Sequence, residues 1–297
     1  MTRFRSILVP TDFSEHAEAA FDRALALAKA ASGVVHLLHA YEIPLGTIPP
    51  YGVAIPESVL AGVRDAAARR LEKAGARAEA AGVRCERHLM QSSPSIAIAE
   101  SARTLGADLV VMGTRGNTGL KHVLLGSVAE RTVRTSPCPV LTLRSDSGGD
   151  SAWRRILVPL DFSKPSEVAL DLAIQLAREN QGEVQLLHAY ELPVSVTMAY
   201  GVAIPQTVWE GVQEAGAQRL SEAADKVEKA GVRVSMAQRT APAADAIVET
   251  AATAHSDIIV MSTRGLTGLK HVLLGSVAER VLRTAPCPVL TLKADAA

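Results

Sequence analysis

The strongest constraint on the fold is an internal repeat. Adding 149 to a residue number maps the first half of the 297-residue chain onto the second without a gap. The segment VVMGTRGNTGLKHVLLGSVAE at 110–130, for example, returns as IVMSTRGLTGLKHVLLGSVAE at 259–279. A repeat of this length has the size of a whole domain. We therefore expect two domains of one fold, 1–144 and 153–297, joined by the small and polar linker SDSGGDSA at 145–152.

Each half alternates short aliphatic runs with longer segments of helical periodicity. In the first half the runs SILVP, VVHLLHAY, VRCERHL, ADLVVM and CPVLTL read as strands, and 57–81 reads as a long alanine-rich helix. Ser14 is expected to cap the first helix and Gly33 to end it. Apolar strands joined by crossover helices predict an α/β fold, a doubly wound, Rossmann-like parallel sheet of five strands in each half.

Composition excludes several classes of partner. Lys plus Arg and Asp plus Glu both number 31, and aromatic residues make up 3%, so we expect no nucleic-acid partner. The uncharged run at 192–209 contains two prolines and reads as a loop, so no membrane span is expected. Three cysteines cannot all pair, and the first residues do not resemble a signal peptide, which favours the cytoplasm.

A candidate ligand site follows from where the glycines fall. Ligands of doubly wound sheets bind beyond the carboxyl ends of the strands, and there Asp12 follows the first strand and Gly113 the fourth. The spacing Gly113-x2-Gly116-x9-Gly126-Ser127 leads directly into a helix. Glycine permits positive φ and close approach of a ligand, and the free amides at a helix start attract anions. The pattern predicts a phosphate cradle.

The chain resembles the tandem universal stress proteins of the ATP-binding type. The resemblance rests on that glycine spacing and on Pro10-x-Asp12-x-Ser14, and it covers both halves. It implies ATP, with or without magnesium, with adenine near the main chain of Ala40 and Met112 and with the glycines along the ribose and phosphates. The candidate ATP-binding residues in the first half are Pro10, Thr11, Asp12, Ala40, Met112, Gly113, Arg115, Gly116, Gly126, Ser127 and Val128. Those in the second half are Asp161, Ala189, Met261, Gly265, Gly275, Ser276 and Val277.

Simpler interpretations compete at several positions. Asp12 is also a good helix cap. Arg115 and Lys121 could neutralise phosphate charge, but they are equally well explained as solvated loop residues. His39 and His188 read as structural, since no second ligand stands beside them at metal spacing, and no metal site is expected. Cysteines 138 and 287, each between prolines, read as packing residues.

Three functional classes remain open. The chain lacks the Gly-x4-Gly-Lys loop of P-loop enzymes, a Gly-x-Gly-x-x-Gly after the first strand, and the Gly-x-Ser-x-Gly of hydrolases, so no residue is assigned a catalytic role. We expect a nucleotide-dependent stress-response module that binds ATP and has regulatory action. A slow ATPase or phosphotransferase using the same pocket, and an interaction scaffold with vestigial sites, are the alternatives.

Two further expectations concern the pair of halves. Each half ends in the apolar strand CPVLTL, which favours pairing of the halves as a pseudo-twofold dimer within the chain and leaves a homodimer of whole chains open. The second half also has Ser262 in place of Gly113 and Leu160 in place of Thr11. If position 113 has positive φ, these changes predict that ATP binds more tightly to the first half.

Overall fold

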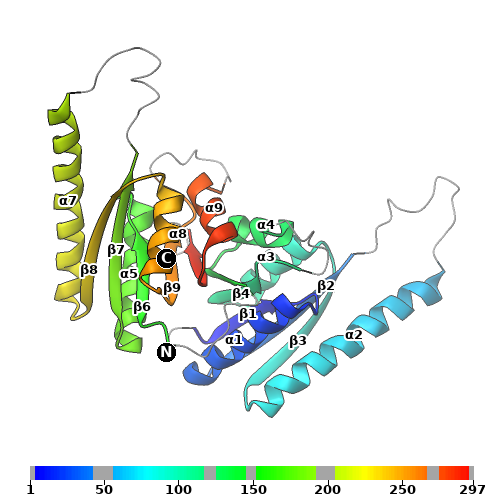
Figure 1. Ribbon diagram of the computed structural model, residues 1–297. Helices are drawn as coiled ribbons and strands as arrows, with labels where there is room; N and C mark the ends of the chain where they lie inside the picture. Colours follow the sequence, from blue (N-terminus) through cyan, green and yellow to red (C-terminus); the bar gives the residue numbers. More distant parts are fainter. Residues whose placement is uncertain are drawn as a thin grey trace, which may run out of the picture. The chain divides into compact units, whose positions relative to one another are not determined.

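The computed structural model describes residues 4–42, 56–116, 125–144, 152–191, 205–265 and 274–293 (Figure 1). The chain divides into two compact units, Met1–Asp150 and Ser151–Ala297. Nearly all of the expected linker falls outside the described residues. So do residues 51–55 and 200–204, where the segment YGVAI stands in each half. Within the described residues, no helix combines the length and the apolar character that crossing a bilayer requires.

The first unit is a parallel sheet in the order β3-β2-β1-β4-β5. The winding reverses between β1 and β4, with α1 and α2 on one face of the sheet and α3 and α4 on the other (Figure 1). Its elements are β1 Ser6–Pro10, α1 Glu15–Ala31, β2 Val34–Tyr41, α2 Glu57–Ala80, β3 Arg84–Gln91, α3 Pro94–Thr104, β4 Leu109–Gly113, α4 Ser127–Thr135 and β5 Val140–Leu143.

The second unit repeats this topology in the order β8-β7-β6-β9-β10. The predicted fold, a doubly wound parallel sheet of five strands in each half, is therefore confirmed. The elements are β6 Arg155–Pro159, α5 Lys164–Asn180, β7 Glu183–Tyr190, α7 Gln206–Lys229, β8 Arg233–Thr240, α8 Ala243–Thr253, β9 Ile258–Ser262, α9 Ser276–Thr284 and β10 Val289–Leu292.

The first helix begins as the sequence predicts but ends differently. The Ser14 side chain accepts a hydrogen bond from the amide of Ala17, which makes Ser14 the N-cap of α1. Ser32, with φ of 50°, takes the left-handed C-cap conformation that we expected of Gly33. Gly33 is needed for a different reason, because a Cβ there would lie 2.5 Å from the carbonyl oxygen of Arg5. The prediction that Gly33 is the helix-ending residue is wrong by one position.

Candidate functional site

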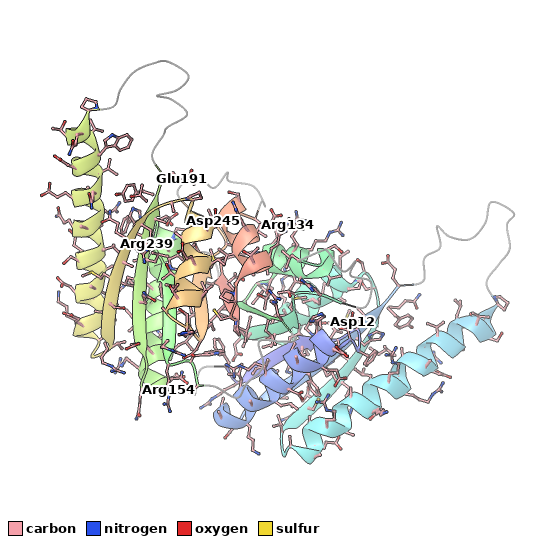
Figure 2. The ribbon with its side chains drawn as sticks, viewed as in Figure 1. Asp12, Arg134, Arg154, Glu191, Arg239 and Asp245 are labelled. Carbon is pink, nitrogen blue, oxygen red and sulfur yellow. The ribbon has the colours of Figure 1, made fainter. Side chains whose placement is uncertain are left out.

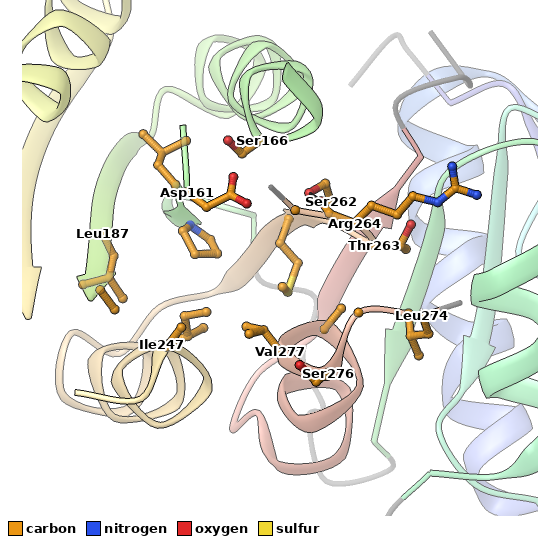
Figure 3. A pocket seen from close by; sticks show the side chains of 18 residues that line it. Asp161, Ser166, Leu187, Ile247, Ser262, Thr263, Arg264, Leu274, Ser276 and Val277 are labelled. Carbon is orange, nitrogen blue, oxygen red and sulfur yellow. Dashed lines mark hydrogen bonds between the residues drawn. The ribbon is translucent and has the colours of Figure 1, made fainter. Parts of the chain in front are cut away.

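A pocket of about 440 Å³ opens in the second unit at the carboxyl ends of β7, β6 and β9 (Figure 3). This is the place where the winding of the sheet reverses, as the sequence predicted. Its lining comprises Pro159, Leu160, Asp161, Ser166, Leu187, Ala189, Ala243, Ile247, Met261, Ser262, Thr263, Arg264, Gly265, Leu274, Gly275, Ser276, Val277 and Ala278. All seven residues expected for the second half are among them.

One wall of the pocket is apolar, and the sequence analysis did not identify most of its residues. Leu187 comes from β7, Ile247 from α8 and Val277 from α9, and Figure 3 shows Ile247 and Val277 on the side opposite Asp161. Ala243, the first residue of α8, also lines the cavity. No motif marks Ala243 or Ile247, and the packing of α8 against β7 brings these two residues to the site.

The polar end of the pocket is the start of α9. Gly275 is its N-cap, with φ of −63° and ψ of 141°, and no side chain caps the first turn. The amide of Gly275 itself donates to the carbonyl oxygen of Thr263 at 3.0 Å, which fixes the loop after β9 against the helix start. A helix start without a side-chain cap presents amide donors and positive dipole potential, so this end of the cavity suits an anion.

Asp161 belongs to a rigid corner between β6 and α5. Its Oδ1 accepts hydrogen bonds from the amide of Ser163 at 3.0 Å and from the Ser163 hydroxyl at 2.6 Å. Ser163 in turn caps α5 by accepting from the amide of Ser166. A Cβ on Gly265 would collide with Asp161 Oδ2, so the glycine lets the loop after β9 lie directly against this carboxylate.

The first unit has the same corner. Asp12 lies where β1 ends and α1 begins (Figure 2), and its Oδ1 accepts from the amide of Ser14 at 3.0 Å and from the Ser14 hydroxyl at 2.6 Å. The interpretation of Asp12 as the cap of α1 is therefore wrong, because Ser14 is the cap and Asp12 orients it. A Cβ on Gly116 would again collide with Asp12 Oδ2.

The remaining expected residues of the first unit take places equivalent to the pocket lining. Gly126 is the N-cap of α4 without a side-chain cap, and its amide donates to the carbonyl oxygen of Thr114 at 2.8 Å. Arg115 is half-buried, and its Nε has no hydrogen-bond partner among the described residues, whereas Lys121 lies outside them. The others lie at strand ends or in the first turn of α4: Pro10, Thr11, Ala40, Met112, Gly113, Ser127 and Val128.

The glycines of the motif are not explained by positive φ. Among the described residues, glycines with positive φ occur at 82, 106 and 231, and the premise that Gly113 is one of them is wrong. Gly113 instead closes β4 against α1, where a Cβ would lie 2.8 Å from the Cβ of His16 and 2.9 Å from its carbonyl oxygen. Close approach of neighbouring protein atoms therefore accounts for Gly113 and Gly116.

Strain at the corner appears at a phenylalanine that the sequence analysis did not single out. Phe13 has φ of 63°, and its counterpart Phe162 has φ of 62°. A left-handed conformation costs a residue with a Cβ roughly 1–2 kcal/mol. The ring of His39 packs 4.6 Å from the Phe13 ring, and His39 Nδ1 is 2.8 Å from the carbonyl oxygen of Thr11. His39 thus contacts both the ring and the backbone of the turn, which supports the structural role predicted for it.

The thiols that precede β5 and β10 are poor nucleophiles. Burial raises the pKa of the Cys138 thiol, and it raises the pKa of Cys287 to about 12. Because the thiolate is the reactive form, both cysteines stay unreactive near neutral pH. This protonation state agrees with their interpretation as packing residues.

Comparisons with known proteins agree with this architecture. The model of the universal stress protein family matches residues 3–144 and 152–293. Universal stress protein MJ0531 of Methanocaldococcus jannaschii is 37% identical over 150 residues, which are 49% of this chain and 85% of that protein. A universal stress protein of Thermus aquaticus is 38% identical over 147 residues, 48% of this chain and 99% of that protein.

A solved structure matches the chain from end to end. The crystal structure of a universal stress protein from Archaeoglobus fulgidus has a TM-score of 0.71 at 24% identity, covering 97% of this chain and 96% of that one. At this identity the likeness concerns the fold, a tandem of Rossmann-like α/β domains. Because the family model spans both halves of the sequence, the chain belongs to the universal stress protein family as a tandem of two such domains.

Proposed function

We propose that the protein is an ATP-binding universal stress protein, a regulatory module whose conformation or partners change with nucleotide occupancy. One observation carries the proposal. At the switch point of the sheet, a single cavity joins an apolar wall to a helix start without a side-chain cap. Its volume of about 440 Å³ lies within the roughly 300–1,000 Å³ typical of small-molecule sites.

The two ends of the cavity suit the two ends of a nucleotide. Leu187, Ile247 and Val277 offer an apolar wall for a planar base, near the main chain of Ala189 and Met261. The phosphates would lie at Gly275 and Ser276, where amide donors and the helix dipole favour negative charge. Asp161 also lines the cavity, and the hydroxyls of a ribose could donate to its carboxylate.

In the first unit the proposed ligand residues are the equivalent ones. Ala40 and Met112 would adjoin adenine, Asp12 the nucleoside, and Gly126 with Ser127 the phosphates. Arg115 supplies a positive charge next to this place, and its Nε is buried without a partner among the described residues. We further propose that the domains are 1–144 and 153–297, that 145–152 is a linker, and that the protein acts in the cytoplasm.

Charge placed at the phosphate end tests the proposal. The double variant Gly126→Asp, Gly275→Asp adds a carboxylate at each helix start, so we expect ATP binding measured by calorimetry to be lost. The control is Gly62→Asp with Gly211→Asp, which adds the same charges in open space on α2 and α7 and should leave affinity unchanged. Equal affinity of the two double variants would overturn the proposal. A phosphate-release assay on the parent protein decides whether the pocket also hydrolyses ATP.

We also propose that the two units pair with one another through their last strands. β5 and β10 each end the strand order within their own unit, and both read VLTL. Apolar strands at a sheet edge favour pairing with a further strand. Separately expressed halves should form a 1:1 complex in analytical ultracentrifugation, and halves that stay monomeric when mixed would exclude this arrangement.

A further inference from the structure

Three side chains on β2 and β3 of the first unit form a cluster that the proposed ATP site does not use. They are His36, Glu86 and His88, and one ligand atom from each lies within 4.8 Å of the other two. Within the described parts of the chain, this is the one group of at least three such side chains with that spacing. The cluster was invisible in the sequence, because its members lie on two strands some fifty residues apart.

The register of the sheet brings the three together. His36 is the parallel partner of Glu86, so both point to the same face of the sheet, and His88 lies two residues further along β3 on that face. His36 Nδ1 is 3.2 Å from His88 Nε2 and 3.4 Å from Glu86 Oε2. His36 thus stands between the other two ligand atoms.

The two separations from His36 Nδ1 are close to the edge length of a coordination tetrahedron. Zinc binds histidine nitrogen and carboxylate oxygen at about 2.0–2.2 Å, which places neighbouring ligand atoms of a tetrahedral site about 3.3–3.5 Å apart. Two histidines and one glutamate are also a known zinc ligand set, in which water takes the fourth position. We propose that His36 Nδ1, Glu86 Oε2 and His88 Nε2 bind one divalent transition-metal ion of the zinc type.

The surroundings prepare the side chains for this role. An Arg84 guanidinium nitrogen donates to Glu86 Oε1 at 2.6 Å, which orients the carboxylate and leaves Oε2 directed at His36. The His36 side chain is 7% exposed and that of Glu86 is 38% exposed, so an ion can enter from solvent on the glutamate side.

The second unit shows that the fold does not need this cluster. The repeat places Gln185, Ser235 and Ala237 at the three positions, and none of them is a strong zinc ligand. There the structure has a small cavity of about 130 Å³, lined in part by Gln185 and Ser235. The same backbone therefore stands with or without the three ligand side chains, and structural packing alone does not explain them.

The proposed metal site is separate from the proposed nucleotide site. His36 and Glu86 are each the third residue of their strands, near the amino ends, whereas the nucleotide pocket lies at the carboxyl ends. Ala40, the expected adenine neighbour on β2, is four residues further on, about 13 Å along the strand. The metal proposal and the ATP proposal can therefore be tested, and overturned, independently of each other.

The test is a metal titration of the full chain, free of any affinity tag and stripped with a chelator. We expect calorimetry with Zn²⁺ to give one tight site per chain, and Co²⁺ to give the visible absorption of a tetrahedral ion. The variants His36→Gln, Glu86→Ser and His88→Ala carry the residues of the second unit, so they should fold. Each should weaken Zn²⁺ binding by about 100-fold or more, and Arg84→Ala, which removes an orienting contact, by about tenfold.

Matched controls separate this site from other ligands. Cys85→Val replaces the thiol between Arg84 and Glu86 with the residue of the second unit and should leave Zn²⁺ affinity unchanged, as should the double variant Gly126→Asp, Gly275→Asp. Absence of a tight site in the parent protein would mean that the cluster is an internally hydrogen-bonded group only. Tight binding that survives His36→Gln and His88→Ala, with circular dichroism unchanged, would assign the ion to other side chains and overturn the proposal.

Discussion

The residue at position 113 and its counterpart at 262 show how the two units differ. In the first unit Gly113 lies so close to His16 that a Cβ would come within 2.8 Å of the histidine Cβ. In the second unit Ser262 stands at the equivalent position of the repeat, and its hydroxyl donates to the carbonyl oxygen of Arg264 at 2.5 Å. The packing of the first unit thus requires the glycine, whereas the second unit accommodates a serine whose hydroxyl is hydrogen-bonded.

This difference predicts an asymmetric cost of exchange. Gly113→Ser forces a Cβ against the backbone of α1 and should lower the free energy of unfolding by about 1–3 kcal/mol. Ser262→Gly removes one hydrogen bond and should cost about 1 kcal/mol. Urea unfolding measures both. Gly62→Ser, in open space on α2, is the control and should not destabilise. If Gly113→Ser is as stable as that control, the packing explanation is wrong.

At the scale of elements, the first and last helices of each unit begin in opposite ways. α1 starts with Ser14, whose side chain satisfies the amide of Ala17 and also donates to Asp12. α4 starts with Gly126, which has no side chain to satisfy its first turn. One helix start is closed by the protein itself, and the other is left with donors for a ligand.

This contrast predicts that two serines near helix starts have separable effects. Ser14→Ala removes a cap and should lower the free energy of unfolding by about 1 kcal/mol, with some loss of ATP affinity because Asp12 loses a donor. Ser127→Ala removes an exposed hydroxyl that caps nothing, so stability should change by less than about 0.5 kcal/mol while ATP affinity falls. Thermal unfolding and calorimetry, run on both variants, distinguish them. A reversed pattern would contradict the assignment of the two helix starts.

Elements were predictable from sequence, whereas contacts between elements were not. The alternation of apolar runs gave the strands, and the helix at 57–81 is found at Glu57–Ala80, because periodicity records local burial. The site residues on the glycine motif were predictable because the motif is contiguous with β4 and α4. Ile247 and the cluster around His36 were not, because strand register and helix packing bring them into place. The positive φ of Phe13 was not predictable either, because Phe13 packs against His39, which lies on β2.

At the scale of the whole molecule, the repeat provides two copies of one site that differ in some of their residues. Around the motif the loop sequences are nearly identical, yet the walls differ. In the second unit Ser262 and Leu160 line the pocket, where the first unit has a glycine and Thr11. Thr11 Oγ1 accepts from the amide of Phe13 at 3.0 Å, and leucine cannot replace this bond. The residues expected at the phosphates are the same in both units, whereas residues that line the rest of the cavity differ. This difference favours two sites of different affinity.

We therefore predict that ATP binds both units, about tenfold more tightly in the first, a difference of about 1.4 kcal/mol. The reason is steric and does not depend on a positive φ at Gly113. Ser262 and Leu160 add side-chain atoms to the cavity of the second unit, and the Ser262 hydroxyl is hydrogen-bonded to the carbonyl oxygen of Arg264. Calorimetry on the single variants separates the sites. Gly126→Asp should remove the tight phase and leave a weak one, and Gly275→Asp should do the opposite. Equal losses would mean that the two walls do not distinguish the nucleotide, and a larger loss from Gly275→Asp would reverse the order, making the second unit the main nucleotide site.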